Sequence, residues 1–437
     1  MKFSLLAIAT GFLVTIVSCR TTPQLGTSEL ATSERVTSIP ALELKDLPFE
    51  FCPLKHSFSL NNALWLTYLA TEQYSHFGIF GPELGRLGFG SPGEGDAYFK
   101  GWYILRIKRI LEKKSDTDDT WTNEDERKKR LELVQNEYKE RFQEDYINDS
   151  LTADDYERLL VDTPSSSKIQ FISGRPSPAS RSSKISSFRK PTTQAVYAEH
   201  PSLDFAVLSI RGTEFDESID LLTDANIAHT SFESMGNVET GFYSAYKEVE
   251  DRILSLLRSK SSLKPINLWV TGHSLGAAVS TLLSAKIMWL HERGDLKNVH
   301  LVGSYNMGSP RIGDHTFAQA FDAMSIKQNV TFVRIRNRGD AVSRIPLADY
   351  WHVGALAYFG KDNILYYGDG WKTIEAKSDY LTSYIPSTAD HKILAYWASL
   401  KKTYFEHKKD EVANCSLIEP NTPPALFYED TDDRKGH

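Results

Sequence analysis

The residues best suited to covalent chemistry lie in one short stretch, Gly272-His-Ser-Leu-Gly276. It follows an apolar run, Leu268-Trp-Val-Thr271, and leads directly into small and aliphatic residues that predict a buried helix. A nucleophile elbow consists of a strand, a serine with glycines two positions before and after it, and a helix. It holds the serine hydroxyl clear of the backbone. Glycine is needed at both flanking positions because a side chain would collide with the neighbouring strand or helix. We therefore predict that Ser274 is a nucleophile and that the free N–H of Leu275, at the helix start, faces an oxyanion formed there.

A serine hydroxyl is a poor nucleophile unless a histidine base lies within hydrogen-bond distance and a carboxylate orients that base. In hydrolases with this elbow, the acid and then the histidine follow the serine along the chain. Asp340 follows a predicted strand, 330–336, at its C-terminal end, where α/β sheets place their sites, and we expect it to be the acid. Two other candidates remain: Asp314, whose position at a helix start favours a capping role, and Asp349.

The base should follow the elbow helix, after which the chain contains His291, His300, His315, His352, His391, His407 and His437. His391 follows a polar loop and opens a predicted helix, which is an exposed place where a side chain can be positioned. His352 lies in a strand-like apolar run, 350–355, which is typical of a buried histidine. His273 adjoins the serine, but neighbouring side chains on a turn point apart, so we interpret it as a packing residue. We therefore predict that His391 is the base that activates Ser274.

Strands and helices alternate through the second half of the chain. Apolar runs predict strands at 193–198, 205–210, 299–305 and 330–336, and amphipathic patterns predict helices at 242–259 and 316–324. This alternation predicts an α/β fold, a mostly parallel, doubly wound sheet with helices on both faces.

The first half of the chain has a different pattern. Helices are predicted at 57–76, 97–114 and 123–148, and a Ser-, Pro-, Arg- and Lys-rich surface loop at 164–191. We interpret 97–190 as a helical insertion. The glycine-rich segment 81–95 contains G-x-G-x-x-G, but no strand precedes it and Pro92 interrupts it, so it is predicted to be a loop and no dinucleotide site.

The composition supports one large folded unit and excludes nucleic acid as a partner. The chain has 437 residues, of which 41% are hydrophobic and 24% charged, so it can bury a sizeable core. Its net charge is −7, and it has no concentrated basic face of the kind that phosphate binding requires. We expect a single domain over residues 48–415, followed by a polar tail, 416–437. The sequence leaves the oligomeric state open.

The N-terminus predicts export and a lipid anchor. An apolar run from Phe3 to Val17 has the length of a signal peptide, too short for a bilayer span, and ends at Ser18 and Cys19. This end resembles the lipobox of bacterial lipoproteins, so we expect a signal peptide at 1–18, lipidation of Cys19 and a polar tether at 19–47. Arg20 favours the outer membrane of the bacterial cell envelope, by resemblance to known sorting rules. The alternatives are an ordinary secretory signal, which would leave the protein secreted, or an uncleaved anchor helix.

Two cysteines remain if Cys19 carries lipid. Cys52 and Cys415 lie at opposite ends of the predicted domain, in a compartment that permits disulfides. We expect them to form a bridge that joins the ends of the domain. The alternative is two unrelated buried thiols.

Several motifs, in order, resemble the class 3 (fungal-lipase-like) lipases over about residues 190–400. They are Arg211-Gly-Thr213, Glu239-Thr-Gly-Phe242, Thr271-Gly-His-Ser-Leu-Gly276, Gly308-Ser-Pro-Arg-Ile-Gly-Asp314, Asn337-Arg-Gly-Asp340 with Pro346, and Asp390-His391. The resemblance implies the α/β-hydrolase fold and a triad of Ser274, Asp340 and His391. It also implies oxyanion donors at Thr213 and Leu275. Thr213 fits on physical grounds too, since it ends a strand beside the elbow.

The resemblance implies a serine-dependent carboxylic ester hydrolase, a lipase acting on acylglycerol esters without a metal or organic cofactor. Phospholipase A1 and short-chain esterase are the competing activities, and a non-catalytic surface lipoprotein on the same scaffold is the alternative from another class. The sequence departs from the family in two places. The expected lid, 214–227, is unusually acidic, which argues against activation at a lipid interface, and 97–190 has no counterpart in the compact family pattern.

Overall fold

The computed structural model divides the chain into Met1–Pro48 and Phe49–His437, and its described residues all lie in the second unit. They are 49–74, 77–113, 123–161, 166–174, 193–212, 228–346, 349–360, 365–367, 387–407 and 415. The predicted signal peptide, Cys19 and the tether lie outside these residues, as do Thr213, the lid segment and the C-terminal tail.

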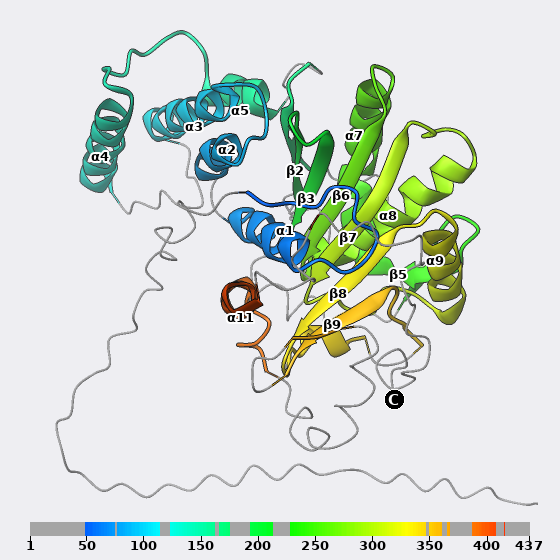
Figure 1. Ribbon diagram of the computed structural model, residues 1–437. Helices are drawn as coiled ribbons and strands as arrows, with labels where there is room; N and C mark the ends of the chain where they lie inside the picture. The colour runs from blue at the N-terminus through cyan, green and yellow to red at the C-terminus, as the bar shows by residue number, and fades with distance from the viewer. Residues whose placement is uncertain are drawn as a thin grey trace, which may run out of the picture. The chain divides into compact units, whose positions relative to one another are not determined.

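An eight-stranded sheet with the order β1-β2-β3-β6-β7-β8-β9-β10 forms the centre of the protein (Figure 1). The five strands from β3 to β9 pair in parallel, while β1, β2 and β10 are antiparallel to their neighbours. The strands are β1 Ile169–Ser173, β2 Gln194–His200, β3 Phe205–Arg211, β6 Ile266–His273, β7 Val299–Met307, β8 Thr331–Asn337, β9 Ala355–Phe359 and β10 Leu365–Tyr367. A small second sheet pairs β4 His229–Ser231 with β5 Asn237–Glu239. The mostly parallel α/β sheet predicted from the sequence is confirmed.

Helices cover both faces of this sheet (Figure 1). On one face lie α7 Thr240–Ser261, α8 Leu275–Glu292 and α9 His315–Lys327, and on the other α1 Leu60–Glu72 and α11 Ile393–His407. The central strands are buried on both sides, which is why they are apolar along almost their whole length. Strand β6 lies between β3 and β7 in the sheet, and His273, its last residue, is buried.

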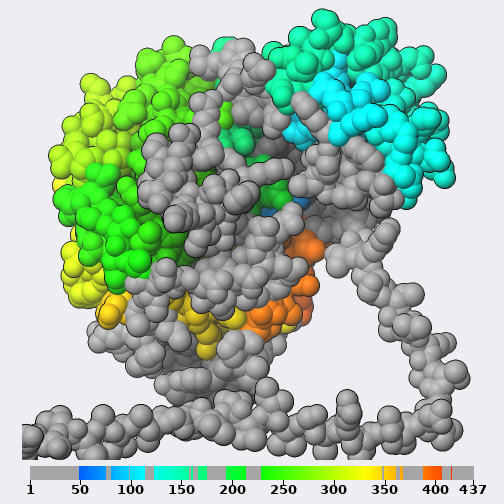
Figure 2. Space-filling model, turned by 180° about the vertical axis from the view of Figure 1, so that it is seen from behind, coloured from blue at the N-terminus to red at the C-terminus, as the bar shows by residue number. Residues whose placement is uncertain are grey.

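The segment between α1 and β2 contains more regular structure than the sequence predicted. It holds α2 Phe77–Arg86, α3 Glu94–Leu111, α4 Glu124–Phe142 and α5 Ala153–Val161, and Figure 2 shows α3 to α5, in cyan and teal, grouped together. Helices α3 and α4 share a small core of their own: Ile107, Ile110, Val134 and Tyr138.

Two predicted loops in this region are wrong in part, because each contains regular structure, although residues 87–93 between α2 and α3 form a loop as predicted. The glycine-rich segment contributes its first part to α2, with Pro82 inside the helix, and its last part to α3. The supposed surface loop at 164–191 contains β1, whose apolar residues pair with β2 at the sheet edge. Five residues are too few for a strand to stand out from a flanking composition rich in Ser, Pro and Lys. The expected strand around His352 also begins later, at Ala355.

A disulfide joins Cys52, before α1, to Cys415, after α11, with their Cα atoms 5.1 Å apart. Helices α1 and α11 pack against each other, so the covalent link and the helix contact hold together the same two ends of the chain. Among the described residues, none of the helices is both long and apolar enough to cross a bilayer.

Candidate active site

The turn after β6 has the geometry of a nucleophile elbow. Ser274 has a positive φ of 58° with ψ −126°, a conformation that L-residues rarely adopt. An added Cβ at Gly272 would lie 2.3 Å from the Gly276 carbonyl oxygen, and one at Gly276 would lie 2.4 Å from the carbonyl oxygen of Ile210 on β3. These are the two collisions expected from the sequence, one with the helix and one with the neighbouring strand. The turn therefore depends on both glycines.

The structure brings together the three residues predicted as a triad. The Ser274 Oγ atom lies 2.8 Å from His391 Nε2, and His391 Nδ1 lies 3.0 Å from each oxygen of the Asp340 carboxylate. Because a carboxylate can only accept, Nδ1 carries the proton and Nε2 is left to accept from the serine hydroxyl. All three side chains are almost fully buried.

Asp340 is held as an anion by donors on several sides. Its Oδ1 accepts from the Val342 N–H at 2.8 Å, and its Oδ2 accepts from the Tyr396 hydroxyl. Burial alone would raise the pKa of this carboxyl, but the His391 imidazole and these hydrogen bonds hold the pKa below its usual value. Burial and the Asp340 charge raise the pKa of Tyr396 well above its ordinary value, so its phenol remains a neutral donor.

Two loops that are distant in sequence are aligned by backbone hydrogen bonds. The loop after β8 and the segment before α11 form a parallel bridge between Asp340 and Ser387, with the Ser387 N–H donating to the Gly339 carbonyl at 2.7 Å. Asn337, the last residue of β8, also donates its side-chain N–H to the Asp390 carbonyl at 3.1 Å. These bonds fix the acid and the histidine relative to each other.

Gly308, the residue directly after β7, lies against the side chains of Asp340 and His391. It has a positive φ of 58°, and an added Cβ would lie 2.8 Å from Asp340 Oδ2 and 2.9 Å from His391 Nδ1. The site therefore requires glycine here for both conformation and space.

The other candidates have different roles. Asp314 caps α9 by accepting from the Phe317 N–H at 2.8 Å, as its sequence position suggested. Asp349 is exposed. His352 is buried and pairs through Nε2 with the Ser343 carbonyl at 2.9 Å. None of the three contacts Ser274.

The structure describes one of the two predicted oxyanion donors, Leu275. Leu275 is the first residue of α8, so its N–H has no carbonyl partner within the helix. This N–H is available at the elbow. A Cβ on Gly212 would lie 3.4 Å from the Ser274 Cβ, so the chain runs beside the nucleophile just before Thr213, which lies outside the described residues. No group of three or more metal-binding side chains occurs within the described ranges.

Sequence reasoning missed Tyr396, Gly308 and the contacts of His273. Tyr396 lies in the first turn of α11, the helix that follows His391, and this spacing was the only signal available. The His273 ring stacks on the His391 ring with 4.6 Å between centroids, so its interpretation as a packing residue is incomplete.

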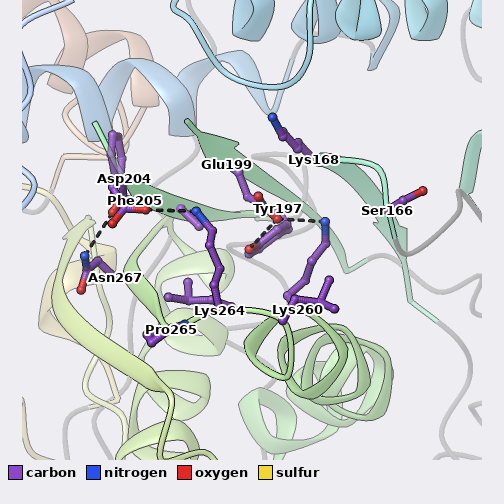
Figure 3. A pocket seen from close by; sticks show the side chains of 13 residues that line it. Ser166, Lys168, Tyr197, Glu199, Asp204, Phe205, Lys260, Lys264, Pro265 and Asn267 are labelled. Carbon is purple, nitrogen blue, oxygen red and sulfur yellow. Dashed lines mark hydrogen bonds and ion pairs between the residues drawn. The ribbon is translucent and has the colours of Figure 1, made fainter. Parts of the chain in front are cut away.

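A cavity of about 210 Å³ lies at the opposite end of the parallel strands, where β3 and β6 begin (Figure 3). Tyr197, Phe205 and Pro265 contribute to its wall. Lys260 pairs with Glu199 at 2.8 Å, and Lys264 pairs with Asp204 at 3.0 Å, so most of its charges are neutralised internally.

The chain is similar to known lipases over part of its length. The family model described as Lipase (class 3) matches residues 207–350, about a third of the chain. The chain is 38% identical over 115 residues to Phospholipase A1-II 3 of Oryza sativa subsp. japonica, which covers 26% of each protein. It is 27% identical over 169 residues to Triacylglycerol lipase OBL1 of Nicotiana tabacum, which covers 37% of this chain and 29% of that protein. The chain thus spans between a quarter and a third of the length of these relatives.

Among solved structures, it is similar to the triacylglyceride lipase of Rhizomucor miehei. The identity is 21%, the match covers 52% of this chain and 80% of the other, and the TM-score is 0.37.

Proposed function

We propose that this protein is a serine-dependent carboxylic ester hydrolase of the class 3 lipase type, which cleaves acylglycerol esters through an acyl-enzyme. The observation that carries the proposal is the continuous hydrogen-bonded series from Ser274 through His391 to Asp340. A serine at a strained elbow, a base in hydrogen-bond contact and a buried carboxylate together provide an activated nucleophile. The matched family model is a second support, since it includes the elbow and Asp340.

The reaction proceeds in two halves. The Ser274 oxygen attacks the ester carbonyl while its proton passes to His391 Nε2, and Asp340 stabilises the imidazolium that forms. The tetrahedral oxyanion accepts hydrogen bonds from the N–H groups of Leu275 and, as we propose from its position after Gly212, Thr213. His391 then gives its proton to the leaving alcohol. Water attacks the acyl-enzyme by the same route, releases the acid and restores the serine.

Replacement of Ser274 by alanine tests this proposal. We expect S274A to fold with unchanged thermal stability and to lose hydrolysis of p-nitrophenyl esters, because the hydroxyl that lies 2.8 Å from His391 Nε2 is removed. A fluorophosphonate probe should label the wild-type protein and not the variant. Retained turnover in S274A refutes the assignment, and a wild-type protein that is neither labelled nor active favours the non-catalytic binding protein.

Phospholipase A1 activity is the second candidate, since relatives with that name match this chain at up to 38% identity. Esters of increasing chain length, assayed beside phospholipids with distinguishable acyl groups at the two glycerol positions, separate the activities. Release of the first-position chain from phospholipids, at rates above those for triacylglycerols, favours the phospholipase.

We further propose that Cys19 is lipidated after removal of residues 1–18, so that a tether holds a single catalytic domain, 48–415, at the bacterial outer membrane. The lipobox-like end of the apolar run supports this. Wild-type protein should partition into the detergent phase and carry an acylated N-terminal cysteine by mass spectrometry, and C19S should do neither. A wild-type protein in the aqueous phase would indicate a secreted form.

A further inference from the structure

The imidazole of His273 contacts the proposed base although it belongs to no part of the triad. Its Nε2 lies 2.7 Å from the backbone carbonyl oxygen of His391, and its Nδ1 lies 2.8 Å from the hydroxyl of Tyr74. The ring is 5% exposed and stacks on the His391 ring at an angle of 30°. His273 is thus held between Tyr74 and the backbone of the histidine loop.

The partners of this ring determine which nitrogen carries its proton. A carbonyl oxygen only accepts, so Nε2 is the donor to His391, and Nδ1 must accept from the Tyr74 hydroxyl. Burial, and then the charge of His391, lower the pKa of His273 to about 3, so the ring is neutral when His391 becomes an imidazolium. The hydrogen bonds run in one direction, from Tyr74 through His273 to the His391 carbonyl.

This contact gives the histidine loop a second fixed point. The bonds of Ser387 and Asp390 already join the backbone of this loop to β8 and the loop that follows β8, on the side of the acid. The bond from His273 fixes the backbone, and His273 is the last residue of β6 and the residue before the nucleophile. The strand that positions the Ser274 hydroxyl therefore also positions the base that must reach it.

We propose that His273, oriented by Tyr74, is a positioning residue that sets the approach of His391 Nε2 to the Ser274 hydroxyl. The kinetic effects expected of this role rest on the proposed function, whereas the structural effects rest on the geometry alone. His273 itself takes up no proton during turnover.

Substitutions that separate the two hydrogen bonds test the proposal. In H273Q the amide nitrogen can occupy the place of Nε2 and still donate to the His391 carbonyl, whereas in H273N the shorter amide reaches only the place of Nδ1. H273L removes both bonds. We expect kcat to fall on the order of 100-fold in H273L and H273N with KM within about twofold, because a small displacement of a catalytic group has an effect of that size. H273Q should recover most of the activity, and Y74F should lose a few-fold.

His200 provides a matched control. It is also a buried histidine bound to a backbone carbonyl, that of Leu87 at 3.1 Å, but it lies on β2, away from the triad. H200L should lower thermal stability about as much as H273L without reducing kcat. Equal losses of kcat in H273Q and H273L, or in H200L and H273L, would show that these histidines act only through packing.

A measurement that does not depend on turnover keeps this inference separate from the proposed function. In ¹⁵N-histidine-labelled protein, the low-field Nδ1 proton of His391, hydrogen-bonded to Asp340, should be observable in the wild type and in H273Q. It should be broadened or lost in H273L and H273N. If the wild type shows no hydrolysis and no probe labelling, the proposed function fails while this result still decides the positioning role. An unchanged resonance in H273L overturns the proposal.

Discussion

The two ends of the parallel strands use buried charge in opposite ways. At the N-terminal end, beside the cavity, Glu199 is paired with the ammonium group of Lys260 at 2.8 Å. At the C-terminal end, Asp340 is paired with His391 and with neutral donors, one of them the Tyr396 hydroxyl. A lysine neutralises its partner permanently, whereas a histidine does so only when it holds a second proton. The carboxylate at the catalytic end is thus stabilised by hydrogen-bond donors and gains a full cationic partner when the serine proton passes to His391.

The strongest test of this contrast removes the Asp340 charge. D340N keeps the size of the side chain but favours the wrong tautomer of His391, and we expect kcat to fall by about 10⁴-fold. Steady-state kinetics on a soluble ester measures the change, with circular dichroism as the check on folding. A loss below tenfold would mean that the buried charge at this end has no catalytic role.

A substitution at the N-terminal end of the parallel strands should change the stability of the protein and leave its activity unchanged. K260M removes the cation from Glu199, whose side chain is only 15% accessible, and we expect the free energy of unfolding to fall by about 3 kcal/mol while kcat is unchanged. K264M is the control, because the Lys264–Asp204 pair is exposed, with side chains 55% and 72% accessible, and should cost less than about 1 kcal/mol. Urea titration gives both values. Equal effects of the two substitutions would contradict the view that burial distinguishes the pairs.

Gly308 tests how little space the catalytic end allows. G308A adds one methyl group within 3 Å of Asp340 Oδ2 and of His391, at a backbone angle that disfavours alanine. We expect a loss of about 100-fold in kcat, since the pair must separate to admit the group. G294A, at a position with positive φ and open space around the added Cβ, is the control for backbone strain alone. Similar kcat values for the two variants would contradict the expectation that an added methyl group at position 308 separates Asp340 from His391.

Acid should weaken the folded state through histidines buried without charge. Burial and nearby arginines, of which Arg334 is one, lower the pKa of His352 well below its ordinary value of 6.5. Below pH 6.5 the unfolded chain therefore binds a proton that the folded chain excludes, so the free energy of unfolding falls as pH falls. We expect H352Q to reduce this slope by up to about 1.4 kcal/mol per pH unit, as measured by urea titration at a series of pH values. An equal slope in H352Q and the wild type would contradict the assignment.

Much of the fold and the central site could be predicted from the sequence because each signal was local. The elbow needs particular residues at fixed spacing, and parallel strands such as β3 are apolar throughout because both faces are buried. Chain order then limited the choice of acid and base to a few loops. The candidates Asp340 and His391 could be selected because Asp340 follows the end of β8 and His391 lies just before the start of α11.

The remaining features depend on contacts between distant segments. Tyr74 lies 199 positions from His273, and no periodicity in the chain relates them. Position 308 must be glycine because the side chains of Asp340 and His391, which come from two other loops, lie against it. The requirement therefore arises from the folded structure and has no local signal in the sequence. Strand β1 was missed because pairing with β2, and not its own composition, makes it a strand.

The bond between Cys52 and Cys415, which have a sequence separation of 363, closes almost the whole predicted domain into one covalent ring. A protease that cuts once inside this ring opens it without releasing a fragment, so the nicked protein keeps its mass until a reductant is added. Gel mobility compared with and without reductant would therefore reveal cleavage that an activity assay misses. Because Cys52 also follows the proposed tether, both products of such a cut would stay attached to the same anchor.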